Sequence, residues 1–303
     1  MGAVSAQPTR SGFIALAGRP NVGKSTLANA VVGAKVAIVS DKPQTTRRAI
    51  RGVANGPDWQ LVLVDLPGVQ RPRDALTERM QRRVEHELED ADGCLFVVNA
   101  EEGVGPGDRF IARLLASAGV PVVIAVNKID RTGRADTAAA LQAAADLDVA
   151  GEVFPVSAAT GSGVTPLVDS LVALLPEGPF YFEPEQRSDQ TEAVMLAELV
   201  REQVLARTRE EVPHSVEVVI EALEQAETAR GELIRIEGVI LAETESQKRL
   251  LIGAGGQMVK SIGIASRRAI ERELGTRVHL ELKVRVRRHW RADERLLDRL
   301  GIE

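Results

Sequence analysis

The segment from Gly18 to Ser25, GRPNVGKS, constrains the fold of this 303-residue chain more than any other. It fits G-x-x-x-x-G-K-[ST], the spacing of a phosphate-binding P-loop, which needs a strand before it and a helix after it. The apolar run 13–17 and the helix-like run 24–32 meet that need. Backbone N–H groups of such a loop form an anion nest at a helix N-terminus. The residues expected to bind nucleotide phosphates here are Gly18, Arg19, Pro20, Asn21, Val22, Gly23, Lys24, Ser25 and Thr26.

Apolar strand candidates alternate with helical segments as far as Leu175. We expect strands at 13–17, 49–54, 60–64, 93–98, 121–126 and 152–155, and helices at 24–32, 74–90, 107–118, 134–147 and 164–175. Short apolar strands separated by helices are typical of an α/β fold, here a six-stranded, mainly parallel sheet with helices on both faces. Asn55-Gly56 is a hairpin signal and predicts one antiparallel pair in that sheet.

The pattern is interrupted near residue 176 by prolines, a glycine and mixed charge. Beyond this break we expect a helix at 191–209, strands at 216–220 and 233–241, helices at 246–252 and 257–273, and a strand at 278–286. This order predicts a second, α+β domain. We therefore divide the chain into a nucleotide-binding domain at 11–178, a linker at 179–192, an α+β domain at 193–291 and a C-terminal tail at 292–303. The aromatic rings at 180–182 are expected to pin the linker against a neighbouring domain.

The motif Asn127-Lys128-Ile129-Asp130 follows the strand at 121–126, at the strand end where ligands of open α/β sheets bind. A carboxylate at Asp130 can accept hydrogen bonds from N1–H and the amino group of guanine, and adenine lacks both donors in that arrangement. Asn127 can tie this motif to the phosphate loop, and the stem of Lys128 can lie on the base. The residues expected to bind guanine are Asn127, Lys128 and Asp130, with Ser157 and Ala158 contributing backbone groups.

Two more loops offer ligands for a metal ion and for the outer phosphate. Asp65-Leu66-Pro67-Gly68 ends the strand at 60–64, so Asp65 can hold Mg2+ through its water shell and the Gly68 N–H can contact the γ-phosphate. The Ser25 hydroxyl can ligate the same ion. A threonine hydroxyl from the polar loop 43–47 can complete the metal shell, and that loop contains two threonines.

Together, these five elements resemble the Ras-like, translation-factor class of GTPases over roughly residues 11–175. The resemblance implies Mg2+-dependent hydrolysis of GTP to GDP and phosphate, with switch loops at about 34–48 and 66–80. It implies Mg2+ ligation by Ser25, Thr46 and Asp65, with Thr45 as the competing threonine. The corresponding switch I residues are Gln44, Thr45, Thr46, Arg47 and Arg48, and the switch II residues are Asp65, Leu66, Pro67, Gly68 and Val69.

The residue that follows Gly68 predicts slow hydrolysis. In Ras a glutamine just after D-x-x-G orients the attacking water, whereas the side chain of Val69 cannot hydrogen-bond a water molecule. Gln70 lies one residue further along. Asn21 resembles the asparagine of potassium-assisted GTPases, in which K+ near the phosphates stabilises developing charge. We expect hydrolysis that is slow, or assisted by a partner or by K+ at Asn21.

The second domain carries a candidate nucleic-acid site. Residues 253–256 fit G-x-x-G between two helices, the loop with which KH domains hold single-stranded nucleic acid, and the element order matches the type II KH fold. The chain has a net charge of −5, yet residues 248–291 hold twelve Lys or Arg against three Glu, and residues 211–245 hold nine Glu against two Arg. This segregation indicates a basic, phosphate-binding face. The expected RNA-binding residues are Lys248, Arg249, Gly253, Ala254, Gly255, Gly256, Lys260, Arg285, Arg287, Arg288 and Arg291.

One GTPase domain followed by one KH domain resembles the Era family over nearly the whole chain. The shared segments include Glu211–Ser215, Glu245–Lys248, Ile252–Gly263 and Val286–Arg291. The resemblance implies GTP and GDP binding, recognition of the 3′ end of small-subunit (16S) ribosomal RNA, and assistance in assembly of that subunit. For some members it also implies peripheral association with the bacterial inner membrane.

The cysteine count and the apolar runs indicate the cellular setting. Cys94 is the one cysteine, so an internal disulfide is excluded, which suits a reducing cytosol. No apolar run approaches the roughly 20 residues of a membrane span. We expect a monomer in the cytoplasm, with peripheral contact at the cytoplasmic face of the membrane left open.

Two rival functions also stay open. An RNA chaperone with incidental GTPase activity would still support ribosome assembly after Lys24→Ala. A membrane-associated regulatory GTPase would bind anionic lipid through its second domain, and competition between RNA and vesicles would identify it. A metabolic NTPase or kinase is disfavoured by Asn127–Asp130 and by the lack of an acceptor-binding motif.

Overall fold

The computed structural model describes residues 9–42, 45–68, 75–209, 212–228 and 231–302. Pro43, Gln44, Val69 and Gln70, which the sequence singled out, lie outside these residues. The chain separates into two compact units, one built mainly from residues up to Asp189 and the other mainly from residues after it. Each unit is considered by itself below.

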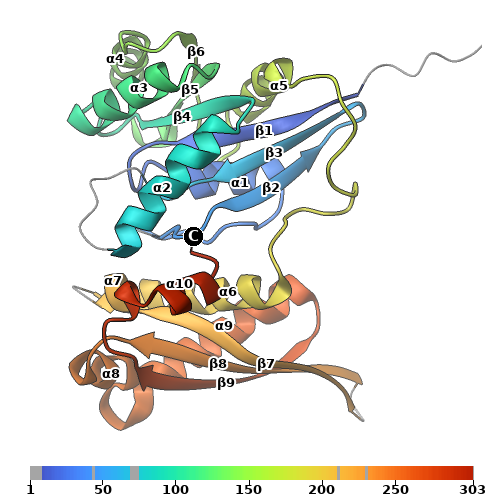
Figure 1. Cartoon of the computed structure of the whole chain (residues 1–303), viewed down its shortest axis with the longest axis vertical. Coiled ribbons are helices and arrows are strands. Elements are labelled where there is room, and N and C mark those ends of the chain that lie inside the picture. The colour runs from blue at the N-terminus through green and yellow to red at the C-terminus, as the bar shows by residue number, and fades with distance from the viewer. Residues whose placement is uncertain (1–8, 43–44, 69–74, 210–211, 229–230, 303) are drawn as a thin grey trace, which may run out of the picture. The chain divides into compact units, whose positions relative to one another are not determined.

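The first unit is built on a six-stranded sheet in the order β2-β3-β1-β4-β5-β6 (Figure 1). All neighbouring strands are parallel except β2 and β3, which form an antiparallel pair. The predicted α/β sheet and its single antiparallel pair are therefore confirmed. The strands are β1 (Arg10–Ala17), β2 (Ile50–Asn55), β3 (Trp59–Asp65), β4 (Gly93–Asn99), β5 (Val122–Asn127) and β6 (Gly151–Pro155).

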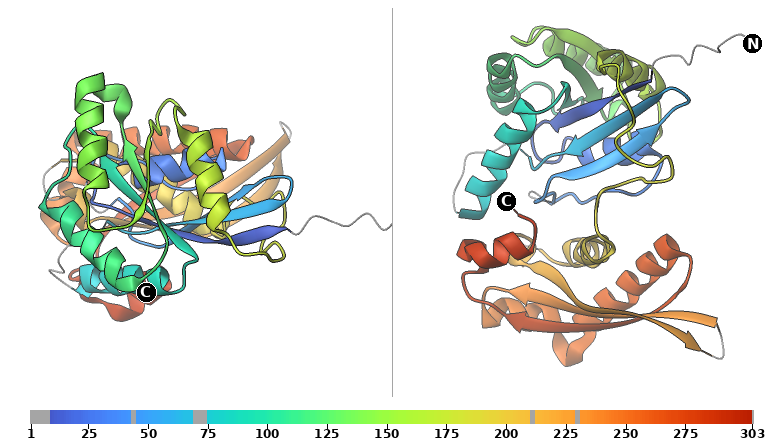
Figure 2. Two further views of the ribbon diagram at one scale, coloured as in Figure 1. Left: turned by 90° about the horizontal axis from the view of Figure 1, so that it is seen from above. Right: turned by 45° about the vertical axis from the view of Figure 1, so that its right-hand side comes forward.

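Helices cover both faces of this sheet, as the views in Figures 1 and 2 show. Residues of α2, α3 and α4 share one buried cluster, whereas residues of α1 and α5 share the other. Alternate residues of β4 enter the two clusters, which explains why its sequence is apolar throughout. The helices are α1 (Lys24–Val32), α2 (Ala75–Glu89), α3 (Pro106–Ala118), α4 (Arg134–Ala145) and α5 (Val164–Leu174).

The segment after α5 packs against the first unit through a buried glutamine. Gln60 of β3 is fully buried, and its Oε1 accepts hydrogen bonds from the backbone N–H groups of Tyr181 (2.7 Å) and Phe182 (2.9 Å). Its Nε2 donates to the carbonyl of Phe182 at 2.8 Å. The Tyr181 ring lies 4.8 Å from the ring of Phe13, centroid to centroid. The Tyr181 ring therefore packs against the first unit as predicted for the linker aromatics. Beside it, Gln60 provides hydrogen-bond partners for the linker's backbone groups.

The second unit has a three-stranded sheet in the order β7-β8-β9, with β7 antiparallel and β9 parallel to β8. Helices α6 and α9 lie over one face of that sheet (Figure 1). The predicted order of helices and strands is confirmed, and one short helix, α7, was not predicted. The elements are α6 (Glu192–Arg207), α7 (Val212–Ser215), β7 (Glu217–Thr228), β8 (Gly231–Ala242), α8 (Glu245–Ile252), α9 (Gln257–Leu274) and β9 (Arg277–Val286).

The chain stays folded beyond residue 291, where the sequence predicts a tail. The Asp293 side chain caps α10 (Glu294–Arg299) by accepting from the N–H of Leu296 at 3.1 Å. Just before it, the buried Trp290 donates from Nε1 to the carbonyl of Ser215 at 2.9 Å. The acidic cap and the leucines at 296, 297 and 300 are the signal from which this helix could have been predicted.

We expect Trp290→Ala to destabilise the second unit by about 3–5 kcal/mol, because it removes a fully buried aromatic side chain. Trp290→Phe should cost less, since it mainly leaves the Ser215 carbonyl without its donor. Hydrogen exchange of the β8 and β9 amides in the full chain measures the effect. Arg288→Ala, an exposed change nearby, is the control, and equal protection in all three variants would contradict the expectation.

Candidate functional site

The carboxyl ends of β1, β3 and β5 bring the predicted nucleotide motifs to one edge of the sheet. β1 leads into the phosphate loop, and α1 begins at Lys24 after Gly23. Gly23 has a φ of 100°, and a Cβ there would lie 2.3 Å from Nδ2 of Asn127. Glycine is therefore required at this position both for its backbone conformation and for the close approach of the β5 loop.

Lys24 is buried beneath the loop. Its Nζ donates to the carbonyls of Gly18 and Arg19, both at 3.0 Å. Burial lowers its pKa to about 8, although the carboxylate of Asp65 opposes that shift. A desolvated ammonium bonded to neutral carbonyls is suited to a stronger, anionic partner such as a phosphate.

Ser25, Thr46 and Asp65 form one cluster of oxygen ligands. The Ser25 hydroxyl donates to Oδ2 of Asp65 at 2.6 Å, and the Thr46 hydroxyl donates to the same oxygen at 3.2 Å. The two hydroxyl oxygens are 3.0 Å apart. Because the Thr46 hydroxyl lies beside Ser25 and Asp65, we favour Thr46 over Thr45 as the switch I metal ligand.

The cluster fits a hard divalent cation. The second oxygen of Asp65, Oδ1, is buried and accepts no hydrogen bond from the described residues. Burial raises the pKa of this carboxyl, although Lys24, Ser25 and Thr46 each oppose that shift. A buried carboxylate with one unused oxygen, beside two hydroxyls, matches the oxygen ligands that Mg2+ prefers.

The β5 loop contacts the phosphate loop on one side and the β6 loop on the other. Asn127 donates from Nδ2 to the carbonyl of Val22 at 2.9 Å, which is the predicted tie, and its Oδ1 accepts from the N–H of Ala158 at 3.0 Å. Asp130 accepts from the hydroxyl of Ser157 at 2.6 Å. The structure therefore brings together all five residues expected to bind guanine, and Ser157 orients Asp130 through its side chain, a role that the sequence did not reveal.

The described part of switch II lies against the phosphate loop. A Cβ on Gly68 would come within 2.9–3.1 Å of atoms of Pro20, so only glycine allows this approach. The preceding Leu66 is fully buried in the core. Arg47 and Arg48 of switch I are also buried, whereas Val69 lies outside the described residues.

In the second unit, the G-x-x-G loop stands at the start of α9. Gly253 has a φ of 72°, and a Cβ there would lie 2.7 Å from Cβ of Met258. Ala254 and Gly255 are exposed. A groove of about 350 Å³ runs along α9 and β9, and apart from Lys260 its lining was not predicted: Val259, Lys260, Gly263, Ile264, Arg267, Leu280, Glu281 and Leu282. An amphipathic pattern alone does not distinguish groove residues such as Ile264 from core residues.

Three of the predicted RNA-binding cations have different surroundings. Lys260 lines the groove, whereas Arg285 forms an ion pair with Glu221 of β7. Arg287 donates from Nε to Asp293 at 3.1 Å. Alternation along β9 does place Arg285 and Arg287 on one face, but carboxylates engage both side chains there.

These features define the class: a GTP-binding P-loop protein with a KH domain. A family model described as "50S ribosome-binding GTPase" matches residues 13–128, and a KH domain model matches residues 211–291. The chain is 45% identical to GTPase Era of Mycobacterium tuberculosis (strain ATCC 25618 / H37Rv), over 96% of this chain and 98% of that protein. It is 44% identical to GTPase Era of Mycobacterium avium, with the same coverage. The chain belongs to the Era family of GTPases.

Two solved structures resemble nearly the whole chain. One is Era in complex with MgGDPNP and nucleotides 1506–1542 of 16S ribosomal RNA, with a TM-score of 0.91 and 35% identity over 97% of this chain and 99% of that one. The other is a single-residue variant of Aquifex aeolicus Era bound to GDP.AlF4-, with a TM-score of 0.90, 34% identity and the same coverage. Within the described residues, no helix is both long and apolar enough to cross a membrane.

The lowered pKa of Lys24 predicts that GDP binding weakens as the pH rises through about 8. Bound phosphate favours the charged ammonium, so above that pH binding must take up a proton. If the bound form keeps its proton throughout, Kd should rise about tenfold between pH 7 and pH 9. Calorimetry in two buffers of different ionisation enthalpy measures both Kd and proton uptake. Lys24→Arg, which does not titrate in this range, should flatten the profile, and a flat profile in the unaltered protein would contradict the assignment.

Proposed function

We propose that this protein is a GTP-hydrolysing switch that binds the 3′ end of 16S ribosomal RNA and assists assembly of the small ribosomal subunit. The observation that carries the proposal is the pairing, in one chain, of a GTPase domain with a KH domain. The solved structure of Era that resembles this chain over 97% of its length contains both MgGDPNP and nucleotides 1506–1542 of 16S ribosomal RNA.

In the nucleotide half, the phosphates would lie on the loop from Gly18 to Thr26 with Lys24 beneath them, and the Gly68 N–H would contact the γ-phosphate. Asp130 would read the guanine edge from the position that Ser157 fixes. Mg2+, held by Ser25, Thr46 and Asp65, would neutralise charge on the phosphates. The chain's own contribution is to hold these groups in place before the reaction, because phosphoryl transfer needs positioning and charge stabilisation more than covalent chemistry.

In the RNA half, the exposed G-x-x-G loop would hold the backbone of a single strand, and the groove along α9 and β9 would take its bases. Exposed apolar groups such as Ile264 offer packing surface, and Lys260 and Arg267 offer charge. Nucleotide-dependent ordering of the switch loops would alter RNA access, and RNA would in turn alter GTP affinity.

The resemblance to the Era family supports a proposal about where this activity takes place. We propose a monomer in the cytoplasm that acts on the small subunit, with peripheral association at the inner membrane as a secondary location. Binding of the RNA in preference to anionic vesicles would support the ribosomal function over a lipid-binding one.

The groove predicts which substitutions abolish RNA binding. Ala254→Asp with Gly255→Asp, and separately Lys260→Glu, should each weaken binding of a 16S 3′-end RNA about tenfold or more, because they place negative charge beside the backbone. Loss of one phosphate contact should also reduce the salt slope by about 0.7. Arg285→Glu, on the ion-paired face, should have a smaller effect. Equal losses for Lys260→Glu and Arg285→Glu, measured by filter binding, would argue against the groove.

Val69 and Asn21 together predict a potassium effect. Asn21 has a φ of 64°, in the left-handed region that few non-glycine residues adopt. We expect GTP hydrolysis to be faster in KCl than in NaCl at equal ionic strength, because K+ near the phosphates would stabilise developing charge where position 69 offers no glutamine to orient the attacking water. Asn21→Ala should remove the difference, and equal rates in the two salts would exclude K+ assistance.

A further inference from the structure

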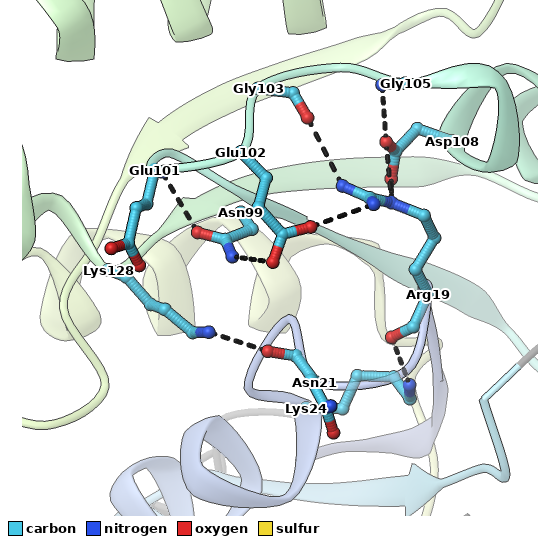
Figure 3. Close-up of polar contacts among 10 residues, drawn as sticks. All are labelled: Arg19, Asn21, Lys24, Asn99, Glu101, Glu102, Gly103, Gly105, Asp108 and Lys128. Carbon is cyan, nitrogen blue, oxygen red and sulfur yellow. Dashed lines mark hydrogen bonds and ion pairs between the residues drawn. The ribbon is translucent and has the colours of Figure 1, made fainter. Parts of the chain in front are cut away.

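The side chain of Arg19 turns away from the phosphate loop to which it belongs. Figure 3 shows its guanidinium among groups of the β4–α3 segment. Nε lies 2.8–2.9 Å from the two oxygens of Asp108, Nη1 donates to Glu102 at 2.9 Å, and Nη2 donates to the carbonyl of Gly103 at 3.3 Å. Every nitrogen of the side chain therefore has an acceptor on that segment, so its charge is directed to α3 and not to the phosphates.

The site that receives Arg19 is shaped for it. Asp108 is fully buried and also accepts from the N–H of Gly105 at 2.8 Å, so its carboxylate is fixed at the start of α3. Glu102 is held by Nδ2 of the buried Asn99 at 2.9 Å. A Cβ on Gly107 would lie only 2.7 Å from Cδ of Arg19, so a side chain there would displace the arginine stem.

The backbone of Arg19 faces the opposite way, toward Lys24. Its carbonyl accepts from Nζ of Lys24 at 3.0 Å, as Figure 3 shows. Two residues later, the carbonyl of Asn21 accepts from Nζ of Lys128 at 2.7 Å, and Asn21 itself adopts a positive φ of 64°. A loop segment in a sparsely populated conformation persists only where its surroundings hold it. Here the side chain of Arg19 holds one end of the segment and Lys128 holds the other.

We propose that Arg19 is a positioning residue for GTP hydrolysis: its ion pair with Asp108 fixes the loop backbone on which Lys24 rests. The inference depends on the proposed GTP site. Loss of the pair would let residues 18–21 move away from α3, and the carbonyls that orient Lys24 would move with them. A displacement of this kind affects both nucleotide binding and turnover, because each needs Lys24 in one place.

The test measures GDP affinity and steady-state GTP turnover for Arg19→Ala, Arg19→Lys and Asp108→Asn in the full chain. Arg19→Ala should raise Kd for GDP and lower kcat, each by about tenfold. Arg19→Lys should recover part of the loss, because it keeps the charge but not the forked geometry. Asp108→Asn keeps an oxygen for the Gly105 N–H, so it should reproduce the alanine effect without removing that cap.

The double variant Arg19→Ala with Asp108→Asn should be no worse than Arg19→Ala alone, since the two residues act as one pair. Arg109→Ala, exposed and next to Asp108, is the matched control and should leave both constants unchanged. Lower thermal stability with unchanged Kd and kcat at temperatures where the variants are folded would overturn the proposal and leave Arg19 a purely structural residue. If the unaltered protein bound no guanine nucleotide, the proposed GTP site would fail instead.

Discussion

The nucleotide-binding unit buries two opposite charges, those of Lys24 and Asp65, at the carboxyl edge of its sheet, and the free-energy cost of burying them shapes what this edge can bind. Burial lowers the pKa of Lys24 to about 8 and raises the pKa of Asp65, so each charged form is disfavoured by its surroundings. Their attraction offsets only part of that cost. Phosphate would stabilise the charged form of Lys24, and a divalent cation would stabilise the charged form of Asp65. This edge of the sheet is therefore suited to a metal–nucleotide complex, which supplies both partners together.

Keeping such charges in place requires a rigid frame. The two buried clusters fix the helices on opposite faces of the sheet, and side-chain bridges then fix the loops that connect strands to helices. Asn127 spans from the phosphate loop to the β6 loop through Val22 and Ala158. Arg19 extends the same frame to α3. Each bridge is an amide or a fork of donors, which fixes direction as well as distance.

The sequence predicts most of the fold and the motifs of the site, for a physical reason. Parallel strands end at one edge, so motifs that follow separate strands must converge, and apolar periodicity locates those strands. The sequence could not distinguish Thr46 from Thr45 by position, because a loop's path depends on packing. It also missed the capped helix α10 and the groove along α9. The hydrogen bonds between Gln60 and the linker join residues more than a hundred positions apart in the sequence, so no local pattern predicts them.

Ion pairing within the second unit bears on where RNA can bind. Lys283 lies 3.1 Å from Glu281 and 3.4 Å from Glu237, and Arg285 meets Glu221, so cations of β9 are opposed by carboxylates of their own sheet. Exposed pairs of this kind add little stability, but they lower the local positive potential. RNA would have to displace those carboxylates to use the face. The lining of the groove along α9 has two cations, Lys260 and Arg267, against one carboxylate, Glu281, so RNA bound there would meet less of that competition.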